Sequence, residues 1–146
     1  MKLVLDASMA LAWLFNRSDE KERVCADKVL LSSSHVDAYI PSLWHIEITN
    51  ALLVGKRRKV VTEAQVIDYI HKLSQLPIIT DDVSIMSRRD VVMGLAHQYD
   101  LSTYDASYLD LALRLQAALA TFDVQLANAM RRAGGVVFES IELATQ

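Results

Sequence analysis

The organisation of the chain is visible in one stretch, LSTYDASYLDLALRLQAALATFD, which covers residues 101–123. Residues 102–116 open with a serine and repeat apolar side chains at helical spacing, which predicts a capped helix. Residues 117–122 (AALATF) predict a strand, and a further helix is expected over residues 123–133. A helix, a strand and a helix in direct succession are typical of α/β proteins.

The same alternation extends through the rest of the chain. Further helices are predicted at residues 8–15, 18–31, 42–59, 62–76 and 84–99, and further strands at residues 2–5, 37–41, 78–80 and 136–140. Strands separated by helices of this length pair in parallel, with helices on both faces of the sheet. We therefore predict a three-layer α/β/α sandwich around a central, mainly parallel sheet.

The composition indicates a single cytoplasmic domain. A chain of 146 residues suits one domain, residues 1–146. Its one cysteine, Cys25, excludes an intramolecular disulfide and fits a reducing compartment. No apolar run reaches the roughly 18 residues of a membrane span, and the N-terminus makes a poor signal peptide. The net charge of −3 gives no overall attraction to nucleic acid, so a nucleic-acid partner would need local basic patches.

Two aspartates of the quoted stretch are predicted to face opposite ways. Each helical residue turns by roughly 100°, which puts Asp105 on the same side as Leu109 and Ala112. Asp110 falls near the opposite side and precedes Arg114 by four residues, the spacing of a surface ion pair. We expect Asp105 to point inward and Asp110 to lie in solvent. The alternative for Asp105 is an acid that only complements the helix dipole.

Glu47 is the least expected residue of the sequence. It lies amid Leu43 and Val54 on the apolar side of its helix, opposite His45 and Lys56, which we expect to face water. An unpaired buried carboxylate is unfavourable or stays protonated, so Glu47 needs a partner. No basic residue on the same face of its helix supplies one.

Two more acids stand where strands end. Asp6 follows the strand at residues 2–5, and Asp123 follows the strand at residues 117–122. In open parallel sheets the functional crevice lies beyond the carboxyl ends of the strands. Each aspartate has the alternative of being a simple cap for the next helix.

Four carboxylates at one sheet edge would repel one another, and a divalent cation relieves that repulsion. Oxygen ligands without a cysteine or histidine pattern favour Mg²⁺ or Mn²⁺ over zinc. A metal-bound water can act as the nucleophile in phosphodiester hydrolysis. The four histidines have no paired spacing, which disfavours a metal-independent nuclease with two histidines.

The sequence resembles PIN-domain ribonucleases, and most closely the VapC-type toxins of toxin–antitoxin pairs. The resemblance rests on an ordered set of motifs: LVLDASMALAWLF (3–15), PSLWHIEITNALL (41–53), LSTYDASYLDLALRL (101–115) and LATFDVQLANAMRRAGGVVF (119–138). It implies a PIN-like fold and a homodimeric, Mg²⁺-dependent endoribonuclease that a cognate antitoxin neutralises. The family's catalytic and metal-binding acids would be Asp6, Glu47, Asp105 and Asp123.

The resemblance also implies supporting polar groups. Ser8 would orient Asp6 or a metal-bound water, Asn50 would support Glu47, and Thr121 would bond near the phosphate or the metal. Each has the alternative of being an ordinary cap or a satisfied core polar group. Asp110 departs from relatives, which often carry a small or apolar residue there.

RNA phosphates have candidate contacts in the basic run GKRRKV (55–60) together with Arg88, Arg89, Arg131 and Arg132. The alternative is a solvated helix end.

Other functions fit the sequence less well. A haloacid dehalogenase-type phosphatase would need a second aspartate where Ser8 stands. A receiver-like domain would need an acidic pair after the first strand. A catalytically silent PIN-like module that only binds RNA or protein remains the main alternative, although all four acids are present.

Overall fold

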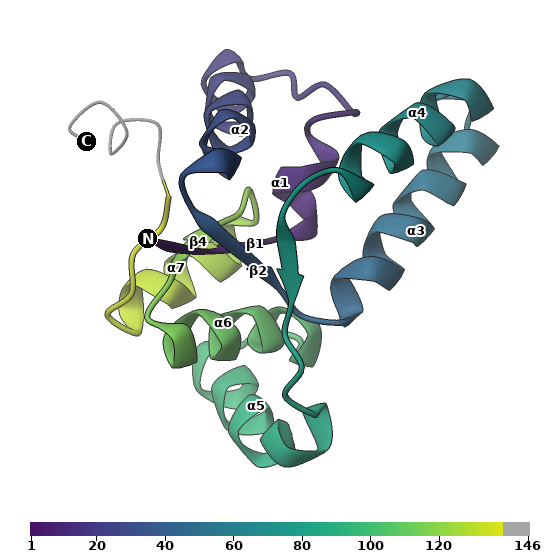
Figure 1. Ribbon diagram of the computed structural model, residues 1–146. Coiled ribbons are helices and arrows are strands. Elements are labelled where there is room, and N and C mark those ends of the chain that lie inside the picture. Colours follow the sequence, from purple (N-terminus) through teal and green to yellow (C-terminus); the bar gives the residue numbers. More distant parts are fainter. Residues whose placement is uncertain (139–146) are drawn as a thin grey trace.

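A computed structural model describes residues 1–138 of the chain (Figure 1). Its centre is a sheet of four strands in the order β3-β2-β1-β4, and every neighbouring pair is parallel. The strands are β1 (Lys2–Leu5), β2 (Asp37–Ile40), β3 (Ile78–Thr80) and β4 (Ala118–Ala120). The predicted parallel sheet is confirmed.

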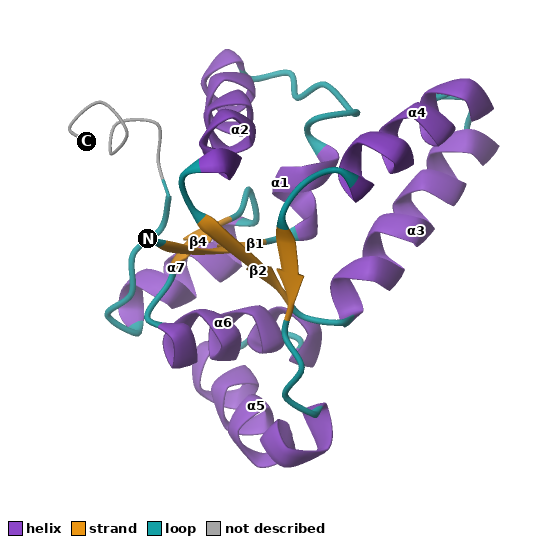
Figure 2. Cartoon of the chain, in the orientation of Figure 1, coloured by secondary structure: helices purple, strands orange, loops and turns teal. Residues whose placement is uncertain are grey.

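Helices cover both faces of this sheet, which confirms the three-layer prediction. Figure 2 shows α5 and α6 on one side of the strands and α1 and α2 on the other. The hairpin of α3 and α4 projects from one end of the sheet (Figure 1). The helices are α1 (Ala7–Leu11), α2 (Glu20–Leu31), α3 (Leu43–Arg57), α4 (Glu63–Ser74), α5 (Ile85–Tyr99), α6 (Thr103–Leu115) and α7 (Val124–Arg132), with a short 3-10 turn η1 at Ser32–Ser34.

The central strand explains why the sequence begins with an apolar run. Leu3, Val4 and Leu5 of β1 are each at most 1% exposed, because helices pack on both faces of the strand. Such a strand needs apolar side chains at consecutive positions rather than at alternate ones. Helix α6 packs on β1 and β4 from one side and lies along α5 on its other side.

Several element ends differ from the predicted ones. Helix α1 ends at Leu11, so the predicted helix at residues 8–15 is shortened. Helix α2 begins at Glu20 instead of residue 18, and its N-cap is Asp19, whose side chain accepts a hydrogen bond from the Lys21 N–H. Helix α3 begins at Leu43 and ends at Arg57, inside the predicted bounds of residues 42–59.

The predicted last strand at residues 136–140 falls partly outside the described residues. Within them, Val137 forms a single parallel bridge with Leu119 of β4. None of the helices in residues 1–138 is both long enough and apolar enough to cross a membrane.

Candidate active site

The pairing of β1 with β4 brings two chain segments together at the carboxyl end of the sheet. Leu5 is paired with Ala120, and the Asp6 N–H donates to the Ala120 carbonyl at 3.0 Å. Asp6 and Thr121 therefore leave adjacent strands at the same level, although 115 residues separate them.

Asp6 is buried, and its side chain binds other side chains instead of capping a helix. It occupies the N-cap position of α1 with extended backbone, yet it makes no side-chain cap bond. Its Oδ2 accepts hydrogen bonds from the Ser8 hydroxyl at 2.7 Å and the Thr121 hydroxyl at 2.6 Å. Burial raises the pKa of Asp6, the two hydroxyls lower it, and the charge of Asp123 raises it further. The cap alternative is thus not the role of this carboxylate.

Ser8 and Thr121 join the turn after β1 to the turn after β4. The Ser8 Oγ accepts from the Phe122 N–H at 3.0 Å, and the Thr121 Oγ1 accepts from the Asp123 N–H at 2.9 Å. Both hydroxyls thereby hold their positions while they donate to Asp6.

Asp123 caps helix α7, which is the alternative role predicted for it. Its Oδ1 accepts from the Leu126 N–H at 2.8 Å at the start of α7. One oxygen suffices for this cap, so the role is compatible with a second role for the other oxygen.

Asp105 lies half-buried in the first turn of α6. Its backbone N–H donates to the Ser102 hydroxyl that caps the helix. Burial raises the pKa of Asp105 to about 6, and the charges of Asp123 and Asp6 contribute in the same direction. Its inward orientation is what the helical wheel predicted.

Glu47 of α3 finds its partner on another helix. The Tyr108 hydroxyl of α6 donates to the Glu47 Oε1 at 2.6 Å. Burial raises the pKa of Glu47, the Tyr108 hydrogen bond lowers it, and the charges of Asp6 and Asp105 raise it again. Tyr108 was not among the residues predicted from the sequence, although it stands one turn after Asp105 and so shares its side of α6.

The four acids therefore form one electrostatic group, here called the acid cluster: Asp6, Glu47, Asp105 and Asp123. Each of the first three has a pKa raised in part by other members. None of the ion pairs among residues 1–138 involves a member of the acid cluster. The cluster thus holds negative charge that no basic side chain of the described part neutralises.

This donor set fits a hard divalent cation. All side chains of the acid cluster offer oxygen, which Mg²⁺ and Mn²⁺ prefer. No three histidine, cysteine or acidic side chains in residues 1–138 are grouped closely enough to hold a metal ion as they stand. Mg²⁺ keeps several waters and binds proteins through one or two carboxylates, so it does not require a closed cage of protein ligands.

Asn50 is not joined to the acid cluster by any hydrogen bond of the described residues. It lies exposed on α3, one turn after Glu47. Its predicted support of Glu47 stays a prediction.

Asp110 contradicts the helical-wheel prediction, because it is buried at 4% exposure. Its Oδ1 lies 2.6 Å from Arg88 Nη2, and its Oδ2 accepts from Arg114 Nε at 3.2 Å. Arg114 also pairs with Asp81 at 2.7 Å. The wheel assumed one buried face, whereas α6 packs on the sheet with one side and on α5 with another. We call Asp81, Arg88, Asp110 and Arg114 the ion-pair cluster.

Part of the predicted RNA-binding set is used within the protein. Arg88 belongs to the ion-pair cluster, Lys56 lies 3.7 Å from Glu63, and the Arg132 guanidinium stacks over the Tyr99 ring. Arg88, held by two hydrogen bonds to Asp110, is therefore a poor candidate for phosphate contact.

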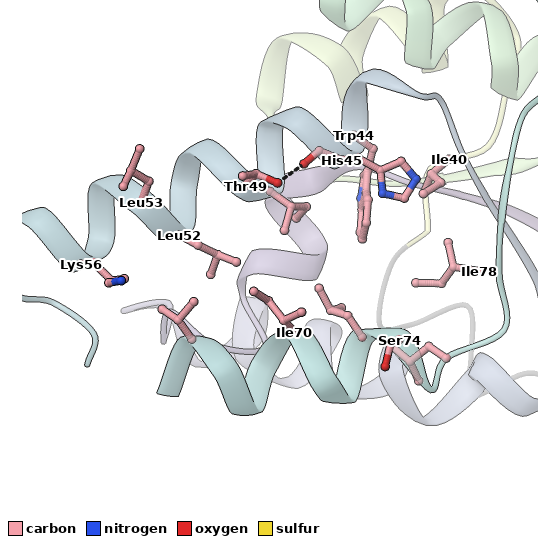
Figure 3. Close-up of a pocket in the computed structure, with 14 residues that line it drawn as sticks. Ile40, Trp44, His45, Thr49, Leu52, Leu53, Lys56, Ile70, Ser74 and Ile78 are labelled. Atoms are coloured by element: carbon pink, nitrogen blue, oxygen red, sulfur yellow. Dashed lines mark hydrogen bonds between the residues drawn. The ribbon is translucent and has the colours of Figure 1, made fainter. Parts of the chain in front are cut away.

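The opposite side of α3 borders a separate groove of about 540 Å³ between α3 and α4 (Figure 3). His45 and Lys56, expected to face water, are exposed and line this groove together with apolar side chains such as Leu52 and Ile70. Glu47 does not line it. Helix α3 thus separates the groove from the acid cluster.

Comparison with known proteins identifies the family of the chain. The PIN domain family matches residues 3–131. Ribonuclease VapC3 from Pyrobaculum aerophilum is 30% identical over 134 residues, which cover 88% of this chain and 94% of that protein.

Solved structures share the fold. The structure of PAE2754 from Pyrobaculum aerophilum has a TM-score of 0.69 and 26% identity, covering 100% of this chain and 91% of that one. VapBC2 from Rickettsia felis, bound to a DNA fragment from their promoter, has a TM-score of 0.64 at 16% identity, covering 95% of this chain and 98% of that one. FitAcB from Neisseria gonorrhoeae has a TM-score of 0.62 at 16% identity, covering 94% and 96%. The match to the PIN domain family spans well over half of the sequence, and the VapC-type relative is 30% identical. The chain therefore belongs to the PIN-domain family and resembles its VapC-type members.

Proposed function

We propose that the protein is a divalent-metal-dependent endoribonuclease that hydrolyses RNA phosphodiester bonds. The observation that carries this proposal is the acid cluster: the pKa values of Asp6, Glu47 and Asp105 are raised in part by the charges of other members, and no ion pair in the described part of the chain involves the cluster. The relative at 30% identity is named a ribonuclease, which supports RNA as the substrate.

In this proposal the acid cluster holds Mg²⁺, for which Mn²⁺ can substitute. When bound, the cation supplies an activated water and neutralises charge that develops on the phosphate. Ser8 and Thr121 hold the Oδ2 of Asp6, and Tyr108 holds the Oε1 of Glu47. The half-buried Asp105, with a pKa of about 6, retains a proton in part of the molecules near neutral pH and releases it when a cation binds.

The biological part of the proposal rests on the VapC-type resemblance. The protein would act in the cytoplasm as the toxin of a toxin–antitoxin pair, form a homodimer through its single domain, and be neutralised by a cognate antitoxin. A basic antitoxin side chain can compete with the cation for carboxylates, because guanidinium–carboxylate pairs are strong.

The test is RNA cleavage with matched variants. Purified protein is incubated with structured and unstructured RNAs in Mg²⁺, in Mn²⁺ or in EDTA. Asp105→Asn removes one charge of the acid cluster, and Asp90→Asn removes an exposed charge from α5 as the control. We expect cleavage in either metal, its loss in EDTA and in Asp105→Asn, and its retention in Asp90→Asn. Cleavage that survives both EDTA and Asp105→Asn would contradict the proposed mechanism.

A further inference from the structure

Glu47 differs from the other members of the acid cluster in how it is held. Asp6, Asp105 and Asp123 lie at the ends of β1 and β4 or in the first turn of α6, where backbone groups and short hydroxyl side chains fix the chain around them. Glu47 lies inside α3 on a longer side chain with more rotatable bonds. The hydrogen bond that holds it comes from Tyr108, 61 residues away.

We propose that Tyr108 is a positioning residue, which fixes one oxygen of Glu47 by its hydroxyl so that the carboxylate is presented to a divalent cation. This inference rests on the proposed function. Tyr108 does not itself contact the cation or the RNA, and it acts through Glu47.

The burial of Tyr108 makes it a rigid donor. The residue has 0% exposure and is one of the largest fully buried side chains of the core. Its ring is fixed by packing, and therefore the hydroxyl at its end has a defined position. A buried hydroxyl without a partner is unfavourable, so the bond to Glu47 satisfies both groups.

The hydrogen bond runs from the Tyr108 hydroxyl to Glu47, because an ionised carboxylate can only accept. Burial raises the pKa of Tyr108, and the nearby carboxylates of Glu47 and Asp6 raise it further. The Tyr108 hydroxyl therefore stays protonated at neutral pH and donates a hydrogen bond to the Glu47 Oε1. Oε1 already accepts this hydrogen bond, whereas no hydrogen bond among the described residues reaches Oε2, so Oε2 is the less engaged oxygen for a cation.

The position of Tyr108 links two helices that both contribute acids. Tyr108 follows Asp105 by three residues on α6, and its hydroxyl crosses to α3. The Tyr108 side chain thus connects Glu47 on α3 to the helix that carries Asp105. Groups that orient metal ligands in this way typically contribute about 10- to 100-fold to metal affinity or activity.

The experiment measures Mn²⁺ binding to the metal-free, full-length protein by calorimetry. Tyr108→Phe removes the hydroxyl and keeps the ring. Tyr69→Phe is the matched control, because the buried Tyr69 hydroxyl also donates one hydrogen bond, to the Ala10 carbonyl, away from Glu47. We expect the dissociation constant for Mn²⁺ to rise by about tenfold or more in Tyr108→Phe and by less than about twofold in Tyr69→Phe. Thermal unfolding of each metal-free variant shows whether it is folded.

A double-mutant cycle with Glu47→Gln separates positioning from a general effect on structure. If Tyr108 acts through Glu47, adding Tyr108→Phe to Glu47→Gln changes the dissociation constant by less than about twofold. A full tenfold effect in that background, or a Tyr108→Phe affinity equal to that of wild type, overturns the inference about Tyr108. Glu47→Gln with unchanged Mn²⁺ binding would instead contradict the proposed metal site itself.

A second measurement applies if Tyr108→Phe does not fold. Wild-type protein labelled with fluorotyrosine is titrated with Mg²⁺, and the fluorine resonance of Tyr108 is followed. A shift with the same midpoint as calorimetric binding supports the inference. A resonance that does not respond while Mg²⁺ binds overturns it.

Discussion

Helix α6 carries two carboxylates, Asp105 and Asp110, in opposite electrostatic situations. Asp110 is buried and accepts hydrogen bonds from two arginines. Asp105 is half-buried, and its nearest charged influences are the like charges of Asp123 and Asp6. The buried carboxylate therefore has cationic partners, whereas, among the described residues, the half-buried one has only like charges beside it. The comparison separates a carboxylate that is paired within the fold from one that, in the proposed function, binds a cation.

The largest effect is expected at Asp110. Asp110→Asn removes the charge that Arg88 and Arg114 share, and breaking a buried pair leaves uncompensated charge. Both guanidiniums reach solvent in part, so we expect the free energy of unfolding to fall by about 2–3 kcal/mol, at the low end for such pairs. Urea denaturation measures this, with Asp90→Asn as a surface control that changes stability by less than about 0.5 kcal/mol. An Asp110→Asn protein as stable as that control would show that the ion-pair cluster is not structural.

Asp105→Asn is expected to have the opposite sign. The substitution removes a charge that burial and the neighbouring carboxylates disfavour, so metal-free protein should be as stable as wild type or slightly more stable. Because Asp105 is partly solvated, we expect a gain below about 1 kcal/mol. Urea denaturation in EDTA measures it. A clear loss of stability would mean that Asp105 serves the fold, as Asp110 does.

The aspartates of the molecule show how far the sequence predicts the site. Asp6 directly follows β1 and Asp123 stands three residues after the end of β4, so a local property of the chain was enough to locate both. Asp105 could be oriented because the face it shares with Leu109 packs on the sheet. Asp110 was misplaced because the second buried face of α6 depends on α5, whose packing no local pattern records.

The partner of Glu47 shows the same limit. The sequence indicated that a half-buried glutamate needs a partner, and it offered none within the helix. The partner, Tyr108, comes from another helix, and only the folded chain brings the two together. Tyrosine amid apolar residues is also typical of an ordinary core position, so its hydroxyl gave no separate signal.

The smallest effect is the pH dependence of stability that Asp105 contributes. The pKa of Asp105 is about 6 in the folded protein and about 3.9 in an unfolded chain, so the folded state binds more protons between these values. Stability linked to Asp105 is therefore present at low pH and is lost as the pH rises from about 4 to about 6. Partial solvation limits the loss to below about 1 kcal/mol. Denaturation of wild-type and Asp105→Asn proteins across this range in EDTA isolates the Asp105 contribution as the difference between their slopes. Equal slopes would show that Asp105 is not destabilised by its neighbours. Saturating Mg²⁺ should also remove the difference, because a bound cation replaces the proton that the acid cluster otherwise retains.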